Sequence, residues 1–173
     1  MSVSNVANSV LALDASTGRR IWHFQTLHHD LWDHDLAVYP NLVRVTHAGK
    51  QIDAVAQVGK RGYVFLFDRV TGKPPFEIEV RPVPPSDVPS EEAWPTQPIP
   101  VKPPPFERQN YGEDGLTNIS QQAHDALLKQ YRKIRSGSAF NPPSLEGTLI
   151  VPGFYGGAGW SGASFDPTTG VLY

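Results

Sequence analysis

The chain has 173 residues, of which 39% are hydrophobic and 18% are charged, so it can form a packed core and does not have the composition of a disordered polypeptide. Its net charge of −2 provides no basic surplus for displacing counterions, and nucleic-acid binding is therefore not expected. The absence of cysteine excludes disulfides, thiolate metal ligands and cysteine nucleophiles from this chain.

The first half of the chain is typical of short strands separated by tight turns. Runs of apolar and β-favouring residues predict strands at residues 10–13, 21–24, 41–46, 52–58 and 62–67. The third and fourth of these form a hairpin pattern around Ala48-Gly49-Lys50. Residues 1–8 lack the charged start and the apolar stretch of a signal peptide, and no apolar run in the chain approaches the roughly 18 residues of a membrane span.

A turn motif, Asp-x-x-Thr-Gly, occurs three times, beginning at Asp14, Asp68 and Asp166. Each copy follows an apolar strand, and the copies are 54 and 98 residues apart. If the longer interval holds two periods and an insertion, the repeat is roughly 40–50 residues long, the length of a four-stranded propeller blade. The alternative is that the motif is simply a favourable hairpin turn.

Prolines are concentrated in one segment, because 12 of the 17 lie between Pro74 and Pro105. Proline has no amide donor and a fixed φ, so we expect neither a sheet ladder nor a helix here, but an extended surface segment with polyproline II character. It is either a linker between domains or an excursion that packs down through Phe76, Trp94 and Phe106.

The second half predicts one helix and a return to β-structure. Apolar residues at helical spacing predict a helix from Ser120 to Arg135, capped at its start by Thr117 or Ser120 and at its end by Gly137. Strands are expected at residues 148–151 and 163–165, and an apolar run occupies residues 171–173. Because neither end resembles a domain boundary, we expect a fragment of a larger, closed β-protein.

Three histidines and three aspartates lie within residues 28–35, the densest group of chemically active side chains in the sequence. Histidine and aspartate are ligands of zinc, manganese and iron, so a metal site is one interpretation. An exposed polar loop is the second. The third is a general base, since the neighbouring Leu31 and Trp32 form an apolar wall that would raise the pKa of a carboxylate.

The residues Ala12-x-Asp14-x-x-Thr17-Gly18-x-x-x-Trp22 resemble the tryptophan-docking motif of dehydrogenases that use pyrroloquinoline quinone (PQQ). These proteins are eight-bladed β-propellers, in which the tryptophan packs between blades while the Asp, Thr and Gly shape the turn. Further segments resemble the membrane-bound quinoprotein glucose dehydrogenase branch: residues 22–36, Gly59-Lys60, Thr96-Gln97-Pro98 and residues 140–149.

The resemblance implies roles for five residues. Asp33, directly after Trp32, would be the catalytic base that takes the hydroxyl proton while a hydride passes to PQQ. Lys60, 27 residues later, would contact the quinone oxygens, where a fixed positive charge stabilises developing negative charge. Asp35 would be a metal ligand or would bond loop amides. Gly159 and Trp160 would line the cofactor pocket, with an inter-blade core position as the alternative for Trp160. The histidines 28, 29 and 34 receive no role beyond orienting Asp33 or lining the entrance.

The resemblance thus implies an all-β fold: part of an eight-bladed propeller, about three blades in one domain over residues 1–173, with a Pro-rich and helical excursion at 74–141. It implies oxidation of a sugar or alcohol with PQQ and Ca²⁺ or Mg²⁺, most of whose ligands would lie outside this chain. Electrons would pass to ubiquinone or a cytochrome, in the periplasm or at its membrane face, with any membrane association made by parts outside this chain. The isolated fragment is expected to be inactive.

Two other functions compete with this one. A non-catalytic scaffold could use the same propeller repeat for protein assembly, but it would have no reason to keep Asp33 and Lys60 at this spacing. A simple His/Asp metalloenzyme would bind metal through residues 28–35 without PQQ.

Overall fold

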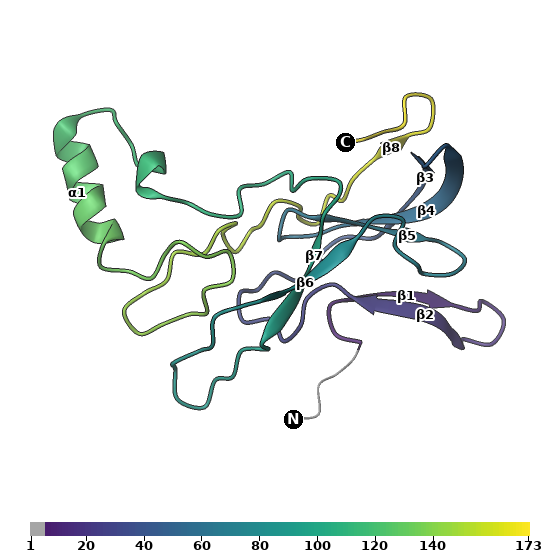
Figure 1. The fold of residues 1–173 in the computed structure, drawn as a ribbon, viewed down its shortest axis with the longest axis horizontal. Coiled ribbons are helices and arrows are strands. Elements are labelled where there is room, and N and C mark those ends of the chain that lie inside the picture. Colours follow the sequence, from purple (N-terminus) through teal and green to yellow (C-terminus); the bar gives the residue numbers. More distant parts are fainter. Residues whose placement is uncertain (1–5) are drawn as a thin grey trace.

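The computed structural model describes residues 6–173. Two predictions therefore fall partly outside it: the domain predicted from residue 1 and the absence of a signal peptide over residues 1–8. Within these residues the strands form four antiparallel sheets (Figure 1). Their members are β1 (Ser9–Leu13) and β2 (Arg20–Gln25); β3 (Asn41–His47), β4 (Lys50–Val58) and β5 (Val64–Asp68); β6 (Ile78–Pro82) and β7 (Thr96–Pro100); and β8 (Phe165–Asp166) and β9 (Val171–Leu172).

The three Asp-x-x-Thr-Gly motifs form the same hydrogen-bonded turn. Asp14 Oδ1 accepts the backbone N–H of Ser16 at 3.0 Å and of Thr17 at 2.8 Å, and also the Thr17 hydroxyl at 2.8 Å. Gly18 has a φ of +70°, which a residue without Cβ adopts at no steric cost, and its N–H donates to the Asp14 carbonyl. The turn at Asp68 repeats these bonds. At Asp166, Oδ1 accepts the Thr168 N–H at 2.8 Å and Oδ2 accepts the Thr169 hydroxyl at 2.7 Å.

These turns make the fold sensitive to acid. The hydroxyl of Ser16, followed by the hydroxyl and amide of Thr17, lowers the pKa of Asp14 from 3.8 to about 2. A carboxylate whose pKa is lower in the folded state stabilises the fold above its unfolded pKa, and this contribution is lost as the pH falls through the folded value. We therefore expect Asp14→Asn to lower stability at pH 7 and to weaken the further loss between pH 4 and 2.

Urea unfolding at pH 7, 4 and 2 measures this effect. Asp125→Asn is the matched control, because Asp125 lies on the exposed helix and the same substitution there touches no turn motif. Parallel stability curves for Asp14→Asn and the unmodified protein would contradict the prediction.

The hairpin of β1 and β2 packs against the three-stranded sheet through Trp22. Its ring lies 5.8 Å from that of Phe67, and its Nε1 donates to the Arg69 carbonyl at 3.2 Å. A Cβ on Gly72 would lie 2.6 Å from the indole, so the glycine of the second turn motif leaves the space that the first motif's tryptophan fills. The two repeats therefore interlock through one aromatic ring.

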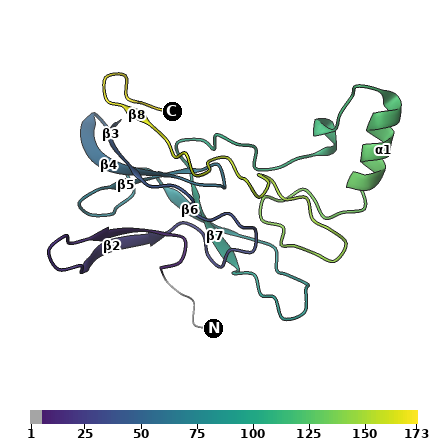
Figure 2. The ribbon, with the colours of Figure 1, turned by 180° about the vertical axis from the view of Figure 1, so that it is seen from behind.

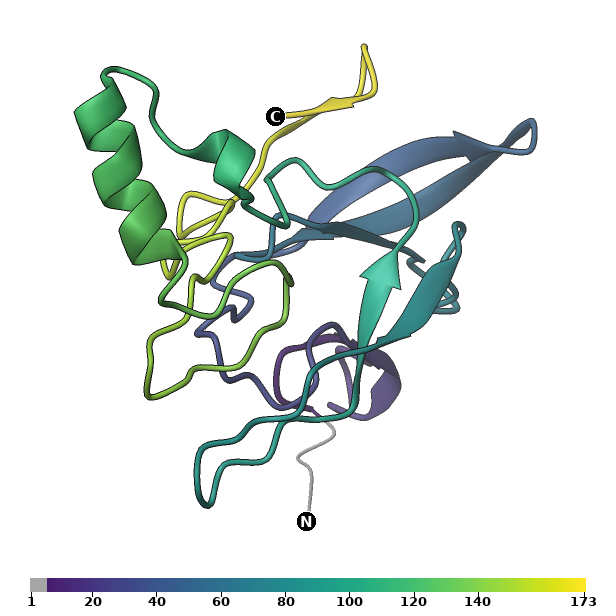
Figure 3. The ribbon, with the colours of Figure 1, turned by 60° about the vertical axis from the view of Figure 1, so that its left-hand side comes forward.

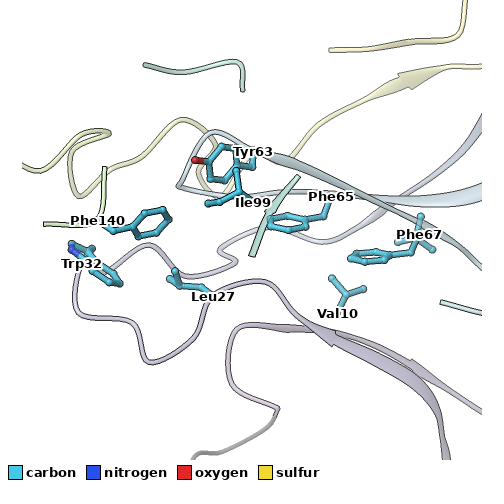
Figure 4. Packing of buried hydrophobic residues seen from close by; sticks show 9 residues of the cluster. Val10, Leu27, Trp32, Tyr63, Phe65, Phe67, Ile99 and Phe140 are labelled. Carbon is cyan, nitrogen blue, oxygen red and sulfur yellow. The ribbon is translucent and has the colours of Figure 1, made fainter. Parts of the chain in front are cut away.

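The main hydrophobic core lies between these two sheets (Figure 4). The rings of Phe65 and Phe67 are stacked, 6.3 Å apart, and Trp32 meets Phe140 edge to face at 5.4 Å. The buried members of this core are Val10, Leu27, Trp32, Val55, Tyr63, Phe65, Phe67, Ile99 and Phe140. On the opposite face of the β3–β4–β5 sheet, a second cluster around Val43, Ala54 and Ala56 contacts Phe165 and Leu172 of the C-terminal hairpin.

The expectation that the Pro-rich segment holds no sheet ladder is wrong, because β6 and β7 pair within it. The N–H of Val83 donates to the Pro95 carbonyl, and the N–H of Val101 donates to the Glu77 carbonyl. In an antiparallel ladder hydrogen-bonded and non-bonded pairs alternate, so the odd-numbered residues of both strands form the hydrogen-bonded pairs. Pro82, Pro98 and Pro100 all occupy the alternate, non-bonded positions, where no amide donor is needed. The segment is packed rather than loose, since Ile99 is in the core.

Two further expectations for the second half need correction. The helix α1 spans Gln121–Tyr131 and ends before the predicted Arg135, so Gly137 does not cap it. Its start is confirmed, because Ser120 Oγ accepts from the Ala123 amide at 3.1 Å. Residues 148–151 form no strand; Thr148 makes an isolated bridge with Arg135, because the segment opposite is irregular.

The helix stands apart from the sheets. It buries no side chain, and in Figures 1, 2 and 3 it projects to the side opposite the long β3–β4 hairpin. It is held by the segment around η1 (Glu113–Gly115): Arg132 pairs with Glu113 through two hydrogen bonds, at 2.8 and 3.0 Å, and the Tyr131 hydroxyl donates to the Tyr111 carbonyl.

Candidate active site

Asp33, Asp35 and Lys60 form one charged group, called here the carboxylate–lysine cluster. Lys60 Nζ donates to the Asp33 carbonyl at 3.0 Å and lies 3.3 Å from Asp33 Oδ2 and 2.5 Å from Asp35 Oδ1. The Lys60 side chain is only 13% exposed, whereas those of Asp33 and Asp35 are 68% and 45% exposed. A lysine side chain that is largely covered along its length therefore contacts two carboxylates that reach solvent.

The two sides of the cluster come from different parts of the chain. Asp33 and Asp35 lie on the loop between β2 and β3, and Lys60 lies in the turn between β4 and β5. Asp33 has a φ of +58°, a conformation that Asp tolerates better than most residues. Trp32 anchors the loop beside it, because its ring is buried and its Nε1 donates to the Asn141 carbonyl at 2.7 Å.

The carboxylates keep the lysine charged. The pKa of Lys60 is raised, mainly by the hydrogen bond to Asp35 and also by Asp33, while partial burial opposes this effect. The site thus holds a fixed cation within hydrogen-bond reach of an exposed carboxylate. This arrangement can accept a proton at Asp33 and can donate a hydrogen bond from Lys60 to a negatively charged oxygen.

The glycine-rich segment packs on the lysine. The Gly157 N–H donates to the Lys60 carbonyl at 2.9 Å, and a Cβ on Gly156 would come within 2.4 Å of the Lys60 Cβ. Gly156 therefore has to be glycine for the two segments to touch. Gly159 and Trp160 lie further along; Gly159 has open space beside it, and the Trp160 side chain is 87% exposed. The roles inferred for both residues stay predictions.

A buried pair, His34 and Arg61, adjoins the cluster in the chain, and the sequence did not reveal it. Arg61 Nη1 donates to His34 Nδ1 at 3.1 Å, and His34 Nε2 donates to the Pro152 carbonyl at 2.9 Å. Burial, followed by the charge of Arg61, lowers the pKa of His34. Burial also lowers the pKa of Arg61, whose guanidinium stacks 4.2 Å from the centre of the Phe140 ring. One signal was available: this pair follows Asp33 and Lys60 by one residue each.

The other histidines of the 28–35 segment lie elsewhere. His28 is tied to β7 through Nδ1 and the Thr96 carbonyl, at 2.9 Å, and its ring meets Trp94 edge to face. His29 is exposed. Among the described residues, no three His, Asp or Glu side chains gather closely enough to hold a metal ion, and Asp35 faces Lys60.

The residues present fit a planar, anionic quinone on two counts. Lys60 supplies a charged donor that stays protonated, and Gly156 and Gly157 bring backbone against Lys60 without side chains in between. The exposed indole of Trp160 adds an aromatic face in the same segment. These features suit a cofactor such as PQQ better than they suit a metal ion bound by this chain alone.

A family model described as "PQQ: Glucose/ethanol/alcohol dehydrogenase, beta-propeller domain" matches residues 2–173. The chain belongs to this family. It is 36% identical over 168 residues to a probable quinate dehydrogenase (quinone) of Xanthomonas campestris pv. juglandis, and 35% identical over 167 residues to the quinoprotein glucose dehydrogenase of Escherichia coli. Each match covers 95% of this chain and 21% of the relative, so the chain spans about a fifth of these relatives.

Solved structures of the family have the same fold. The quinohemoprotein alcohol dehydrogenase from Comamonas testosteroni matches 97% of this chain and 19% of its own, with a TM-score of 0.54 and 26% identity. A europium-containing methanol dehydrogenase matches with a TM-score of 0.53 at 19% identity, which supports the fold alone. The predicted fold class, part of an all-β propeller, is confirmed; the single-domain boundaries stay a prediction. Residues 6–173 include no helix with the length and hydropathy of a transmembrane segment.

Proposed function

We propose that this chain is part of a PQQ-dependent dehydrogenase that oxidises a hydroxyl group of a sugar or alcohol. The observation that carries the proposal is the contact between Asp33 and Lys60, an exposed carboxylate 3.3 Å from the ammonium of a largely covered lysine side chain. The match of residues 2–173 to the family supports it. The names of the relatives include glucose, glycerol, quinate, shikimate and alcohol as substrates, all of which carry a hydroxyl group.

In this proposal, each residue of the carboxylate–lysine cluster has a separate task. Asp33 accepts the proton of the substrate hydroxyl, because it is the most exposed carboxylate of the cluster. Lys60 donates a hydrogen bond to a cofactor oxygen, and Gly159 and Trp160 line the cofactor site. PQQ, when bound, supplies a two-electron acceptor. Asp35 holds the Lys60 ammonium in place and is also the candidate ligand of a Ca²⁺ or Mg²⁺ ion whose other ligands lie outside this chain.

The partners follow from the same proposal. Two relatives are named as quinone-linked enzymes and one as a quinohemoprotein, which supports ubiquinone or a cytochrome as the electron acceptor. We propose a location in the periplasm or at the periplasmic face of the membrane.

The test of the function is a dye-linked assay on the whole protein, freed of cofactor and then supplied with PQQ and Ca²⁺. Glucose, glycerol, quinate and ethanol form the substrate panel. PQQ-dependent dye reduction with at least one of them is expected. A folded protein that neither binds PQQ nor reduces dye would contradict the proposal and would favour the scaffold.

Lys60→Ala tests the cofactor contact. The lost charge-assisted hydrogen bond is worth about 1.5–3 kcal/mol. We therefore expect the dissociation constant of PQQ to rise about tenfold or more, together with a lower turnover. Lys50→Ala is the control, since Lys50 is exposed at the start of β4, the end of that strand opposite to the Lys60 turn. Equal PQQ affinity in both variants, measured by absorbance titration, would remove Lys60 from the site.

A further inference from the structure

The buried pair has an unusual composition for a structural core. Arg61 is 5% exposed, and no ion pair joins its guanidinium to a carboxylate of the described residues. It donates to His34 Nδ1, the Val151 carbonyl and Gln109 Oε1, and it interacts with the Tyr63 hydroxyl. A buried charge costs several kcal/mol unless it is well paired, so replacing it by an apolar side chain would often be neutral or favourable for stability alone. The arrangement calls for a reason beyond stability.

The hydrogen bonds of His34 fix its tautomer. Arginine has donors and no acceptor, so the bond from Arg61 requires His34 Nδ1 to be without a proton. Nε2 then carries the proton, and it points at the carbonyls of Pro152, at 2.9 Å, and Gly153, at 3.3 Å. The imidazole therefore acts as a directed link, accepting on one side and donating on the other.

This link joins the three segments that carry the candidate site. His34 lies between Asp33 and Asp35 in the chain, Arg61 follows Lys60, and Pro152 and Gly153 directly precede the glycine-rich segment. Side chains of the loop alternate, with Asp33 exposed and His34 buried. A displacement of the imidazole would therefore move both neighbouring carboxylates relative to the Lys60 ammonium.

We propose that His34, through its bond to Arg61, is a positioning residue that sets the distance between Asp33 and Lys60 and holds the glycine-rich segment against them. The inference rests on the proposed function for its activity measurement. A cofactor that contacts both Lys60 and the glycine-rich segment binds well only when the two are already held at the correct distance from each other. The buried pair thus acts on PQQ affinity as well as on turnover.

The experiment compares three substitutions in the whole protein. His34→Leu removes both hydrogen bonds. His34→Gln keeps a donor near the Nε2 position and loses the acceptor for Arg61, whereas His34→Asn keeps an acceptor near Nδ1 and loses the donor. His29→Asn is the matched control, since His29 is an exposed histidine of the same loop with a φ of +41°, which asparagine tolerates.

Three quantities are measured: the melting temperature, the dissociation constant of PQQ on cofactor-free protein, and the turnover number per bound PQQ. For His34→Leu we expect the turnover number per bound PQQ to fall about tenfold to hundredfold, as for a misplaced reacting group. The KM for the substrate should change far less. PQQ binding is expected to weaken as well. His34→Asn and His34→Gln should each recover part of both losses, and His29→Asn should match the unmodified protein.

A purely structural role would lower the melting temperature while leaving PQQ affinity and turnover per bound PQQ unchanged, and this result would overturn the inference. If His34→Leu does not fold, the Gln and Asn variants decide by the same criteria. If the protein turns out to have no dehydrogenase activity, the proposed function fails. The PQQ titration still decides the inference then, because unchanged affinity in a folded His34 variant contradicts it.

Discussion

If the proposed function holds, replacing Asp33 with asparagine should reduce turnover of the whole protein about 10²- to 10⁴-fold, the usual cost of losing a general base, while PQQ stays bound. Asparagine is nearly isosteric with aspartate and can still accept a hydrogen bond from Lys60, so the loop and the cofactor site should survive. It cannot take a hydroxyl proton at neutral pH. Steady-state dye reduction and the PQQ absorbance of the same preparation measure the two effects together.

The control for this variant is Asp125→Asn on the exposed helix, which should have full activity. Asp30→Asn is the comparison within the loop. The Asp30 carboxylate accepts a hydrogen bond from the Trp32 backbone N–H at 2.9 Å, so its role in the loop is structural. If Asp33→Asn keeps more than about a tenth of the original turnover, the base is another carboxylate, and Asp35 or Asp30 would be examined next.

Trp22→Ala should be among the most destabilising single substitutions in the chain. The indole fills the space between the two repeats, against Phe67 and the glycine of the second turn motif, and donates one hydrogen bond across it. Removing a large packed aromatic side chain costs about 3–5 kcal/mol. Since Trp22 is half-buried, the lower part of this range is expected.

His29→Asn is the comparison for stability, because His29 is exposed and asparagine tolerates its φ of +41°, so the change should cost about 0.5 kcal/mol or less. Thermal or urea unfolding of the whole protein gives the order of the two effects. A larger loss for His29→Asn than for Trp22→Ala would show that the tryptophan does not dock the repeats.

The features that the sequence predicted well are those set by short-range chemistry. The strands beside the three turn motifs could be predicted because Asp14 and Gly18 specify a turn locally. The β6–β7 pair could not, since whether a proline breaks a ladder depends on its position in the register, and the register is a property of both strands. The end of α1 could not be predicted either. The helix buries no side chain, so packing does not extend it to Arg135, and the apolar spacing alone overestimated its length.

The candidate site divides in a similar way. Asp33 and Lys60 could be proposed from the resemblance, and the structure places them 3.3 Å apart. The hydrogen bond between His34 and Arg61 could not be predicted, because it depends on which way each side chain turns from its segment. Histidine and arginine next to charged neighbours suggest surface positions, and only the fold shows that both are buried.

Calorimetric titration of the cofactor-free and metal-free whole protein tests the central claim most directly. PQQ is added in the presence of Ca²⁺, and Zn²⁺ is added in a separate titration. We expect saturable binding of one PQQ per protein, weakened by Lys60→Ala and retained by Asp33→Asn, with no tight Zn²⁺ binding by residues 28–35. Tight Zn²⁺ binding together with no heat of PQQ binding would contradict this and would identify the histidine- and aspartate-rich loop as a metal site.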